Sequence, residues 1–231
     1  MTIKDNLRRW GANMRRRGAR RTLDLDETFF DVVDSEEKAY WLGFILADGS
    51  VGRTRSGNWY VTVDLATQDI EHLYKLKEAL KSSTEVKFAH NDRSAYIRFC
   101  ARQLCEALGH YGVTPNKTGK HSTPDIQEEF KKHFWRGVID GDGSLFFSYP
   151  NWCFSLTGYT NFLHDAQDWL MDNAELKETK LLNKNCASDI SELRYTGTQQ
   201  VARICRTLYD DATIYLERKL ERANQCILDS L

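Results

Sequence analysis

The chain has 231 residues, 41% of them hydrophobic and 12% aromatic, which is enough for one large domain or two compact halves. The apolar run from Tyr40 to Ala47 is far shorter than the ~20 residues that span a bilayer, and the N-terminus has no apolar signal region. We therefore expect no membrane association and no secretion. The six cysteines form no CxxC pair, so we expect free thiols in a reducing compartment, either cytoplasm (with the nucleoid) or an organellar matrix.

The net charge of −1 is unevenly distributed along the chain. Residues 1–21 hold eight lysines and arginines against Asp5 alone, so the rest of the chain carries a net charge of −8. A basic arm, which we assign to residues 1–27, on an acidic body favours a polyanionic partner. The alternative is a disordered, solvated tail.

Residues 35–112 alternate between helical and strand periodicities. A helix is predicted from an N-cap at Ser35 to Asp48, where Gly49 ends it. Residues 58–67 alternate apolar and polar side chains, as in a half-buried strand. The other predicted elements are a strand near 50–54, a helix over 70–80 capped by Asp69, a hairpin of strands 84–90 and 94–100 around Asn91-Asp92, and a helix from 101 that ends near Gly112.

The same order of elements is predicted again after residue 125, so each stretch has four strands. Strands with one polar face form a sheet that leaves one side free for a partner. The second set comprises a helix over 126–140, strands near 144–149 and 152–157, a helix over 161–174, strands near 179–184 and 190–196, a helix over 197–211 and a further helix over 215–228.

An internal repeat supports this duplication. WLGFILADGS at 41–50 and WRGVIDGDGS at 135–144 agree at six of ten positions. Ile97-Arg98-Phe99 is similarly matched by Leu193-Arg194-Tyr195, 96 residues later. The chain therefore contains two copies of a unit of roughly 95 residues.

The two decapeptides resemble the signature helices of the LAGLIDADG homing endonucleases, and the order αββαββα in each copy is similar to that family's half-domain. The resemblance covers about residues 28 to 225. It implies an α+β fold of two pseudo-symmetric αββαββα half-domains, 28–122 and 123–231, each with a four-stranded antiparallel sheet and packed together through the two signature helices.

The two aspartates at the helix ends are the predicted metal ligands and catalytic residues. Gly43 and Gly137 lie in mid-helix, where glycine costs about 1 kcal/mol relative to alanine, so we expect the helices to pack closely at these positions. Close packing would bring Asp48 and Asp142 together. With the backbone carbonyls of Ala47 and Gly141, the two carboxylates would bind Mg²⁺ or another divalent cation such as Mn²⁺. Each copy of the repeat could then cleave one DNA strand.

The copies differ at the position of the family's first acid, which is Asp140 in the second copy and Leu46 in the first. The resemblance implies that this acid is often replaced, so Asp140 is expected to be accessory. It also implies a basic residue near the metal centre late in each half. Lys117 and Lys219 are the candidates, with Lys120 and Arg218 as reserves, and a solvated surface role is the alternative for each.

The polar strand faces are expected to read double-stranded DNA in the major groove, and the N-terminal arm to add phosphate contacts. Each candidate has an ordinary surface charge as its alternative. The candidates are Arg53, Arg55, Arg93, Arg98, Lys180, Lys184 and Arg194 in the body and Arg15, Arg16 and Arg17 in the arm.

The function implied by the resemblance is a monomeric, sequence-specific endonuclease of a mobile element, which cuts both strands of a long site and leaves short 3′ overhangs. Two alternatives use the same scaffold. One is an RNA-splicing maturase, and the other is a DNA-binding regulator without catalysis. Retention of both aspartates favours the enzyme. The chain ends lack splice-junction residues, so an intein is not expected.

Overall fold

The computed structural model describes residues 24–115, 123–183 and 189–231. Lys117, Lys120, Lys184 and the arginines of the N-terminal arm lie outside these ranges. Among the described residues, no helix is long and apolar enough to cross a membrane.

The first half follows the predicted order, with one added turn of 3-10 helix before its second α-helix. Ser35 caps its first helix by accepting a hydrogen bond from the Lys38 backbone N–H at 3.3 Å. The elements are α2 (Glu36–Asp48), β1 (Gly49–Arg53), β2 (Trp59–Ala66), η1 (Thr67–Asp69), α3 (Ile70–Ala79), β3 (Lys87–Ala89), β4 (Ser94–Phe99) and α4 (Arg102–His110).

The second half repeats this order and adds a C-terminal helix. Its first helix ends at Asp142, two residues later than predicted, so both signature helices end at the second aspartate of their motif. The elements are α5 (Glu128–Asp142), β5 (Gly143–Ser148), β6 (Asn151–Tyr159), α6 (Thr160–Ala174), β7 (Leu182–Asn183), β8 (Ile190–Thr196), α7 (Thr198–Tyr209) and α8 (Glu217–Leu228).

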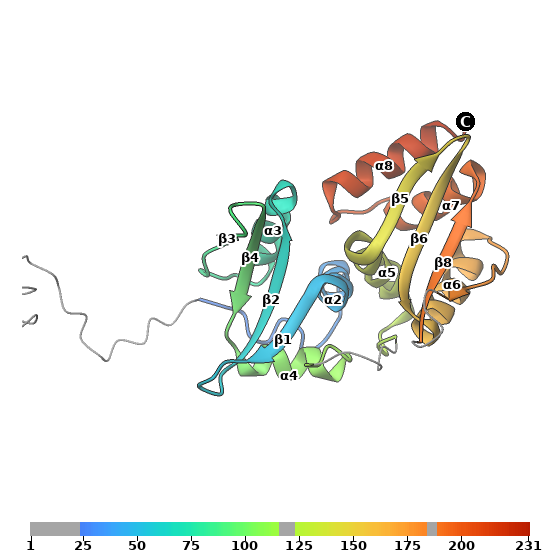
Figure 1. Cartoon of the computed structure of the whole chain (residues 1–231). Coiled ribbons are helices and arrows are strands. Elements are labelled where there is room, and N and C mark those ends of the chain that lie inside the picture. Colours follow the sequence, from blue (N-terminus) through green and yellow to red (C-terminus); the bar gives the residue numbers. More distant parts are fainter. Residues whose placement is uncertain (1–23, 116–122, 184–188) are drawn as a thin grey trace, which may run out of the picture.

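Each half contains a four-stranded antiparallel sheet, in the orders β1-β2-β4-β3 and β5-β6-β8-β7. Strand alternation sends one set of side chains into the core, including Val61, Val63 and Ile97 in the first half and Leu193 in the second. The helices pack on that side of each sheet (Figure 1). The α+β fold of two matching half-domains is confirmed.

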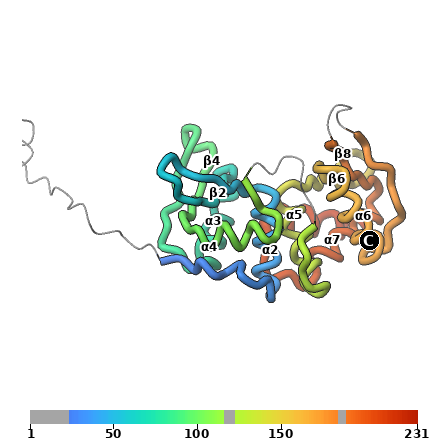
Figure 2. Tube along the Cα trace, turned by 90° about the horizontal axis from the view of Figure 1, so that it is seen from below, coloured from blue at the N-terminus to red at the C-terminus, as the bar shows by residue number. Residues whose placement is uncertain are grey.

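Helices α2 and α5 lie side by side at the centre of the molecule, with one sheet on either side (Figures 1 and 2). Residues 39–46 of α2 and 134–140 of α5 are buried, because each helix is covered there by its own sheet and by the other helix. The central helix pair therefore holds the two halves together.

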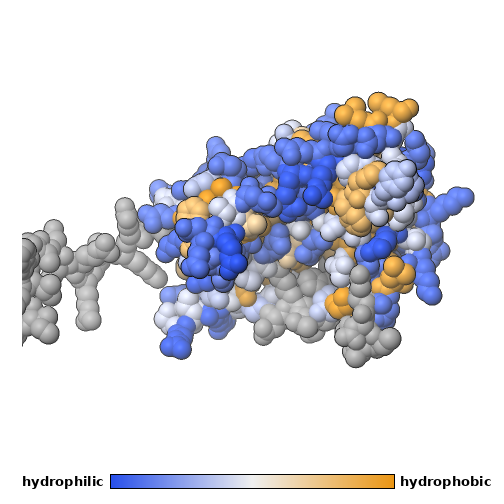
Figure 3. Space-filling model, turned by 45° about the horizontal axis from the view of Figure 1, so that its top comes forward, coloured by the Kyte–Doolittle hydropathy of each residue, from blue (hydrophilic) through white to orange (hydrophobic). Residues whose placement is uncertain are grey.

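The face turned forward in Figure 3 is mostly hydrophilic, with a few separate apolar patches.

Two local expectations need correction. Asp69 precedes α3 as predicted, but its side chain caps no helix N–H and instead accepts two hydrogen bonds from Arg218 Nε, at 2.8 and 3.1 Å. The strand expected at 179–184 is only the two-residue β7. In contrast, the predicted hairpin is confirmed, because β3 and β4 pair antiparallel around a turn in which His90, Asn91 and Asp92 have positive φ angles.

Candidate metal and DNA-binding site

The close approach of α2 and α5 depends on two reciprocal glycines. A Cβ added to Gly43 would lie 2.1 Å from the carbonyl oxygen of Phe134, and one added to Gly137 would lie 2.1 Å from that of Tyr40. Each distance is far below van der Waals contact, so each helix backbone rests on the other at its glycine. The predicted role of the mid-helix glycines is confirmed.

This packing brings the ends of the two helices together. A Cβ on Gly141 would lie 2.6 Å from Ala47 Cβ and 3.3 Å from a carboxylate oxygen of Asp48. The Asp48 side chain therefore crosses to the end of α5, next to Asp142. Asp48 is half-buried and Asp142 is exposed, so their carboxylates differ in access to solvent.

Both helices end in the same way. The N–H of Gly49 donates to the carbonyl of Ile45, and the N–H of Gly143 donates to that of Ile139. The remaining carbonyls at a helix C-terminus carry partial negative charge, which favours a cation there. The two aspartates add full negative charges to the same place.

Lys219 lies at the end of α5, as its predicted position near the metal centre requires, but it is buried. Its side-chain nitrogen donates to the carbonyls of Ile139, at 3.1 Å, and Gly143, on either side of Asp142. Burial lowers the pKa of Lys219 to about 8, and the charges of Asp140 and Asp48 act in the opposite direction. Lys219 thus places a positive charge at the end of α5, and its expected catalytic role near the metal centre stays a prediction.

Asp140 lies fully buried in the last turn of α5. It accepts hydrogen bonds from the hydroxyl of Tyr209 at 2.5 Å, from that of Tyr40 at 2.8 Å and from the Leu216 backbone N–H at 2.8 Å. Burial raises the pKa of Asp140, against the effect of these bonds. Leu216 immediately precedes α8, so Asp140 fixes the start of the helix that carries Lys219.

The hydroxyl of Tyr40 has one hydrogen, which it donates to Asp140, so its second contact must be as an acceptor. That contact is with His72 Nε2 at 2.9 Å, and Nε2 must therefore carry the ring hydrogen. Nothing in the sequence motif pointed to this chain of hydrogen bonds from His72 through Tyr40 to Asp140. The signal that could have indicated it is the pair of polar residues, Tyr40 and Asp140, placed on otherwise apolar helices.

The arginine candidates lie in different settings. Arg98 and Arg194 project from the sheet faces opposite the helices, whereas Arg53 is on the other face by register and stacks over the Trp59 ring at 4.0 Å. Arg55 and Arg93 are exposed in turns, and Lys180 is exposed before β7. The structure thus brings two of the predicted arginines to matching places on the two sheets.

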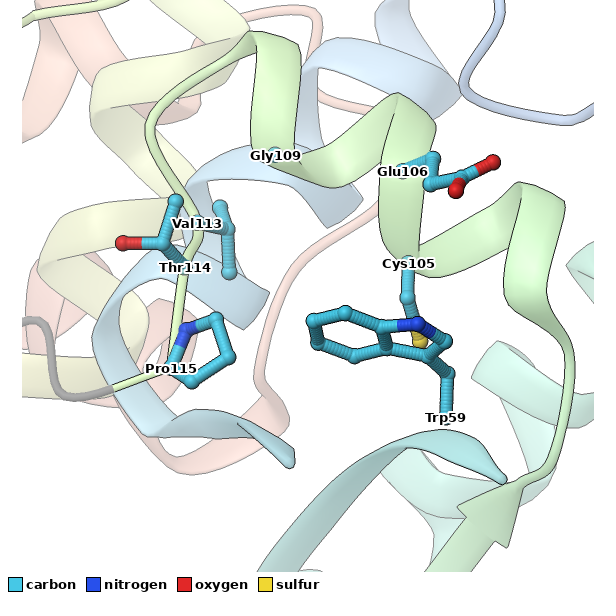
Figure 4. A pocket seen from close by; sticks show the side chains of 7 residues that line it. All are labelled: Trp59, Cys105, Glu106, Gly109, Val113, Thr114 and Pro115. Carbon is cyan, nitrogen blue, oxygen red and sulfur yellow. The ribbon is translucent and has the colours of Figure 1, made fainter. Parts of the chain in front are cut away.

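A pocket near the helix ends contains Ala47 and Asp142 in its wall and has a volume of about 80 Å³. A second pocket, of about 140 Å³, lies between β2 and α4, where Trp59 faces Val113 and Pro115 (Figure 4). Burial raises the pKa of Cys105, which lines the second pocket, to about 11. That thiol is therefore protonated at neutral pH and is no nucleophile.

No protein-family model and no curated protein sequence matches the chain. Its three-dimensional structure does match solved ones. The LAGLIDADG meganuclease I-AabMI, bound to uncleaved DNA, has a TM-score of 0.59 and 14% identity, with 83% of this chain and 89% of that chain covered. This chain has the LAGLIDADG homing endonuclease fold.

Two further structures with the LAGLIDADG fold give the same result. The homing endonuclease I-LtrWI, bound to target DNA, has a TM-score of 0.55 and 11% identity, with 88% of this chain and 90% of that chain covered. I-SmaMI, bound to cleaved DNA, has a TM-score of 0.56 and 14% identity, with 85% and 92% covered. At these identities the likeness is one of fold, consistent with the paired helices and paired sheets.

Proposed function

We propose that this chain is a sequence-specific DNA endonuclease that hydrolyses both strands of a long double-stranded site with a divalent metal. The observation that carries the proposal is the meeting of two aspartates at the ends of the paired helices, where Asp48 lies against Gly141 next to Asp142. Three structures with the same fold, I-AabMI, I-LtrWI and I-SmaMI, are described as bound to DNA. Their fold supports a double-stranded DNA partner here.

The donor set at the helix ends fits a hard divalent cation. The described residues contain no group of three or more histidines, cysteines and acids that could hold a metal ion, so the protein offers two carboxylates and the carbonyls beside them. Mg²⁺ suits such a site, because it commonly keeps waters and binds through one or two carboxylates plus phosphate oxygens. One fold neighbour, I-SmaMI, is described with calcium ions and uncleaved DNA.

A bound divalent cation would supply an activated water and would stabilise the leaving oxygen. The residues of this chain would hold the site in shape. Gly141 leaves room for the Asp48 carboxylate, and Lys219 fixes the carbonyls on either side of Asp142. Both carboxylates come from one chain, so a monomer would carry the complete pair.

The test uses the DNA that flanks this reading frame, joined as if the frame had never been inserted. Purified protein is incubated with this duplex in EDTA, Mg²⁺ or Mn²⁺, and both strands are followed on a denaturing gel. We expect cleavage of both strands that requires metal. Asp48→Asn and Asp142→Asn should each reduce cleavage at least a hundredfold or leave only nicking, because each removes one of the two charged ligands.

Asp172→Asn is the matched control, because Asp172 is an exposed acid on α6. It should cleave as the unmodified protein does. Binding of the duplex without cleavage in any divalent metal would contradict the enzyme and would favour a DNA-binding regulator. Binding of RNA transcribed from the flanking sequence, in place of the duplex, would favour a maturase.

A further inference from the structure

Two arginines occupy equivalent positions on the free faces of the two sheets. In the first sheet, backbone register aligns Ser50, Thr62 and Arg98 across β1, β2 and β4. In the second sheet, the equivalent row across β5, β6 and β8 is Ser144, Ser155 and Arg194. Each row thus has two hydroxyl residues and one arginine, and the two arginines occupy equivalent backbone positions. Their side-chain partners differ.

Arg98 is held by neutral groups. Its Nε donates to Thr62 Oγ1 at 2.9 Å, and its guanidinium lies 4.4 Å from the ring centre of Tyr60 and 5.9 Å from that of Tyr96. The Tyr60 ring in turn rests on Gly52, where a Cβ would lie 2.7 Å from the tyrosine hydroxyl. These contacts orient the guanidinium and leave its positive charge uncompensated.

Arg194 forms an ion pair with Glu192. Its Nε and one terminal nitrogen both donate to the same carboxylate oxygen of Glu192, at 3.2 and 2.8 Å. The Glu192 side chain is only 5% exposed and that of Arg194 is 43% exposed. Glu192 occupies the register position that Tyr96 has in the first sheet, so a tyrosine in one half is replaced by an acid in the other.

The strands of the two free faces therefore differ in net charge. The first face carries Lys87 and Arg98 against Asp64, a net charge of +1. Among the strand residues that the structure describes, the second carries Arg194 against Glu192, a net charge of zero. We expect the DNA phosphate backbone to attract the first face more strongly. A cation that no acid compensates can neutralise a phosphate and release the counterion bound to the DNA there, which favours binding.

We infer that the two sheets bind DNA by different physical means, and this inference rests on the proposed function. The first sheet supplies salt-sensitive affinity through Arg98. The second sheet contributes little to affinity for DNA of arbitrary sequence, because Glu192 compensates Arg194. Glu192 is thus a specificity-determining residue. It keeps Arg194 from binding phosphates generally and leaves it for an acceptor on a base edge that meets the remaining donors.

The test measures binding of the full chain to a mixed-sequence duplex, so the target need not be known. Fluorescence anisotropy in EDTA, over a series of KCl concentrations, gives the slope of log affinity against log salt. Arg98→Ala should reduce the magnitude of this slope by about one and weaken binding at every salt concentration. Arg194→Ala should leave both nearly unchanged. Glu192→Gln should increase the slope by about one and tighten binding.

A double-mutant cycle separates this mechanism from simple removal of negative charge. If Glu192 acts through Arg194, the gain from Glu192→Gln must disappear in the Arg194→Ala background. Asp64→Asn is the matched control, because Asp64 is an exposed acid on the first sheet, and its gain must persist in that background. Thermal denaturation of each variant confirms that the buried Glu192 site still folds.

Three outcomes decide the matter. Failure of the unmodified protein to bind duplex DNA at low salt contradicts the proposed function itself and the inference with it. Binding in which Arg98→Ala and Arg194→Ala change the slope equally overturns the inference alone. A gain from Glu192→Gln that persists without Arg194 also overturns it, while its loss supports it.

Discussion

Leu46 and Asp140 occupy matching positions in α2 and α5, yet their surroundings are opposite. Leu46 lies with Val138, Leu156 and Phe162 in the wall of a small apolar pocket. Asp140 lies among hydrogen-bond donors from α2, α7 and the start of α8. The two halves therefore share a backbone framework but differ in the polarity of the residues around their signature helices.

A second matched pair shows the same change. Leu42 in α2 corresponds to Arg136 in α5, and both are fully buried. The Arg136 guanidinium donates to the carbonyls of Leu208, at 3.1 Å, and Ile214, at 2.9 Å, and to the carboxylate of Glu36, at 2.6 Å. The charged residues of α5 thus contact the end of α7 and the segment between α7 and α8. The polar interior of the second half therefore fixes the start of α8, which positions Lys219.

The largest expected effect tests what the two halves have in common. Gly137→Ala should reduce the free energy of unfolding by more than about 3 kcal/mol or prevent folding, because its Cβ would lie 2.1 Å from a backbone oxygen of the other helix. Gly43→Ala should act alike, since its contact has the same length. Chemical denaturation followed by circular dichroism measures the loss.

Gly109 provides the control, since it lies in α4 and a Cβ there would meet nothing within 4 Å. Gly109→Ala should stabilise the protein by about 0.5–1 kcal/mol, as alanine usually does in a helix. Equal losses for the three variants would show that the central contact is not what holds the halves together.

The next effect tests what separates the halves. Asp140→Leu gives α5 the residue that α2 has, and it leaves two tyrosine hydroxyls and the Leu216 N–H without their acceptor. Unfolding free energy should fall by about 3–4 kcal/mol, measured by urea denaturation. Asp140→Asn keeps the shape and one acceptor oxygen and should lose about half as much. A neutral result for the leucine variant would mean that the polar network does not stabilise the second half.

The sequence predicted the features that repeat and missed those that do not. The glycines and aspartates were recognisable because both copies carry them at the same spacing, and helix and strand periods recur with them. The burial of Lys219 and the partners of Asp140 depend on the segment 209–219, which has no counterpart in the motif. Asp69 was predicted as a cap from local chemistry, but a distant arginine, Arg218, binds it instead. Long-range polar contacts of this kind leave no local pattern.

A smaller effect depends on pH and arises in the first half. Burial lowers the pKa of His72 from 6.5 to about 3, and the charges of Lys75 and Arg218 act in the same direction. Below pH 6.5 the unfolded chain binds a proton that the folded protein does not, so the free energy of unfolding falls as pH decreases toward 3. The loss at about pH 5 should reach roughly 2 kcal/mol relative to neutral pH.

His72→Gln removes the titrating group and keeps a donor for the hydroxyl of Tyr40. Unfolding by urea at several pH values should show a flatter pH dependence for this variant than for the unmodified protein. The same slope for both would place the pH dependence in other residues.

The smallest effects concern the ion pairs that tie the start of α8 to the first half. Arg218 binds the buried Asp69, whose side chain is 7% exposed, whereas Lys75 binds Glu217, whose side chain is 52% exposed. Solvent screens the second pair more, so Asp69→Asn should cost about 1 kcal/mol of unfolding free energy and Glu217→Gln less than about 0.5 kcal/mol. Denaturation in low and high salt measures both. If Glu217→Gln lowered the unfolding free energy as much as Asp69→Asn, solvent exposure would not govern the strength of these ion pairs. The two pairs would then act as one cooperative network rather than separately.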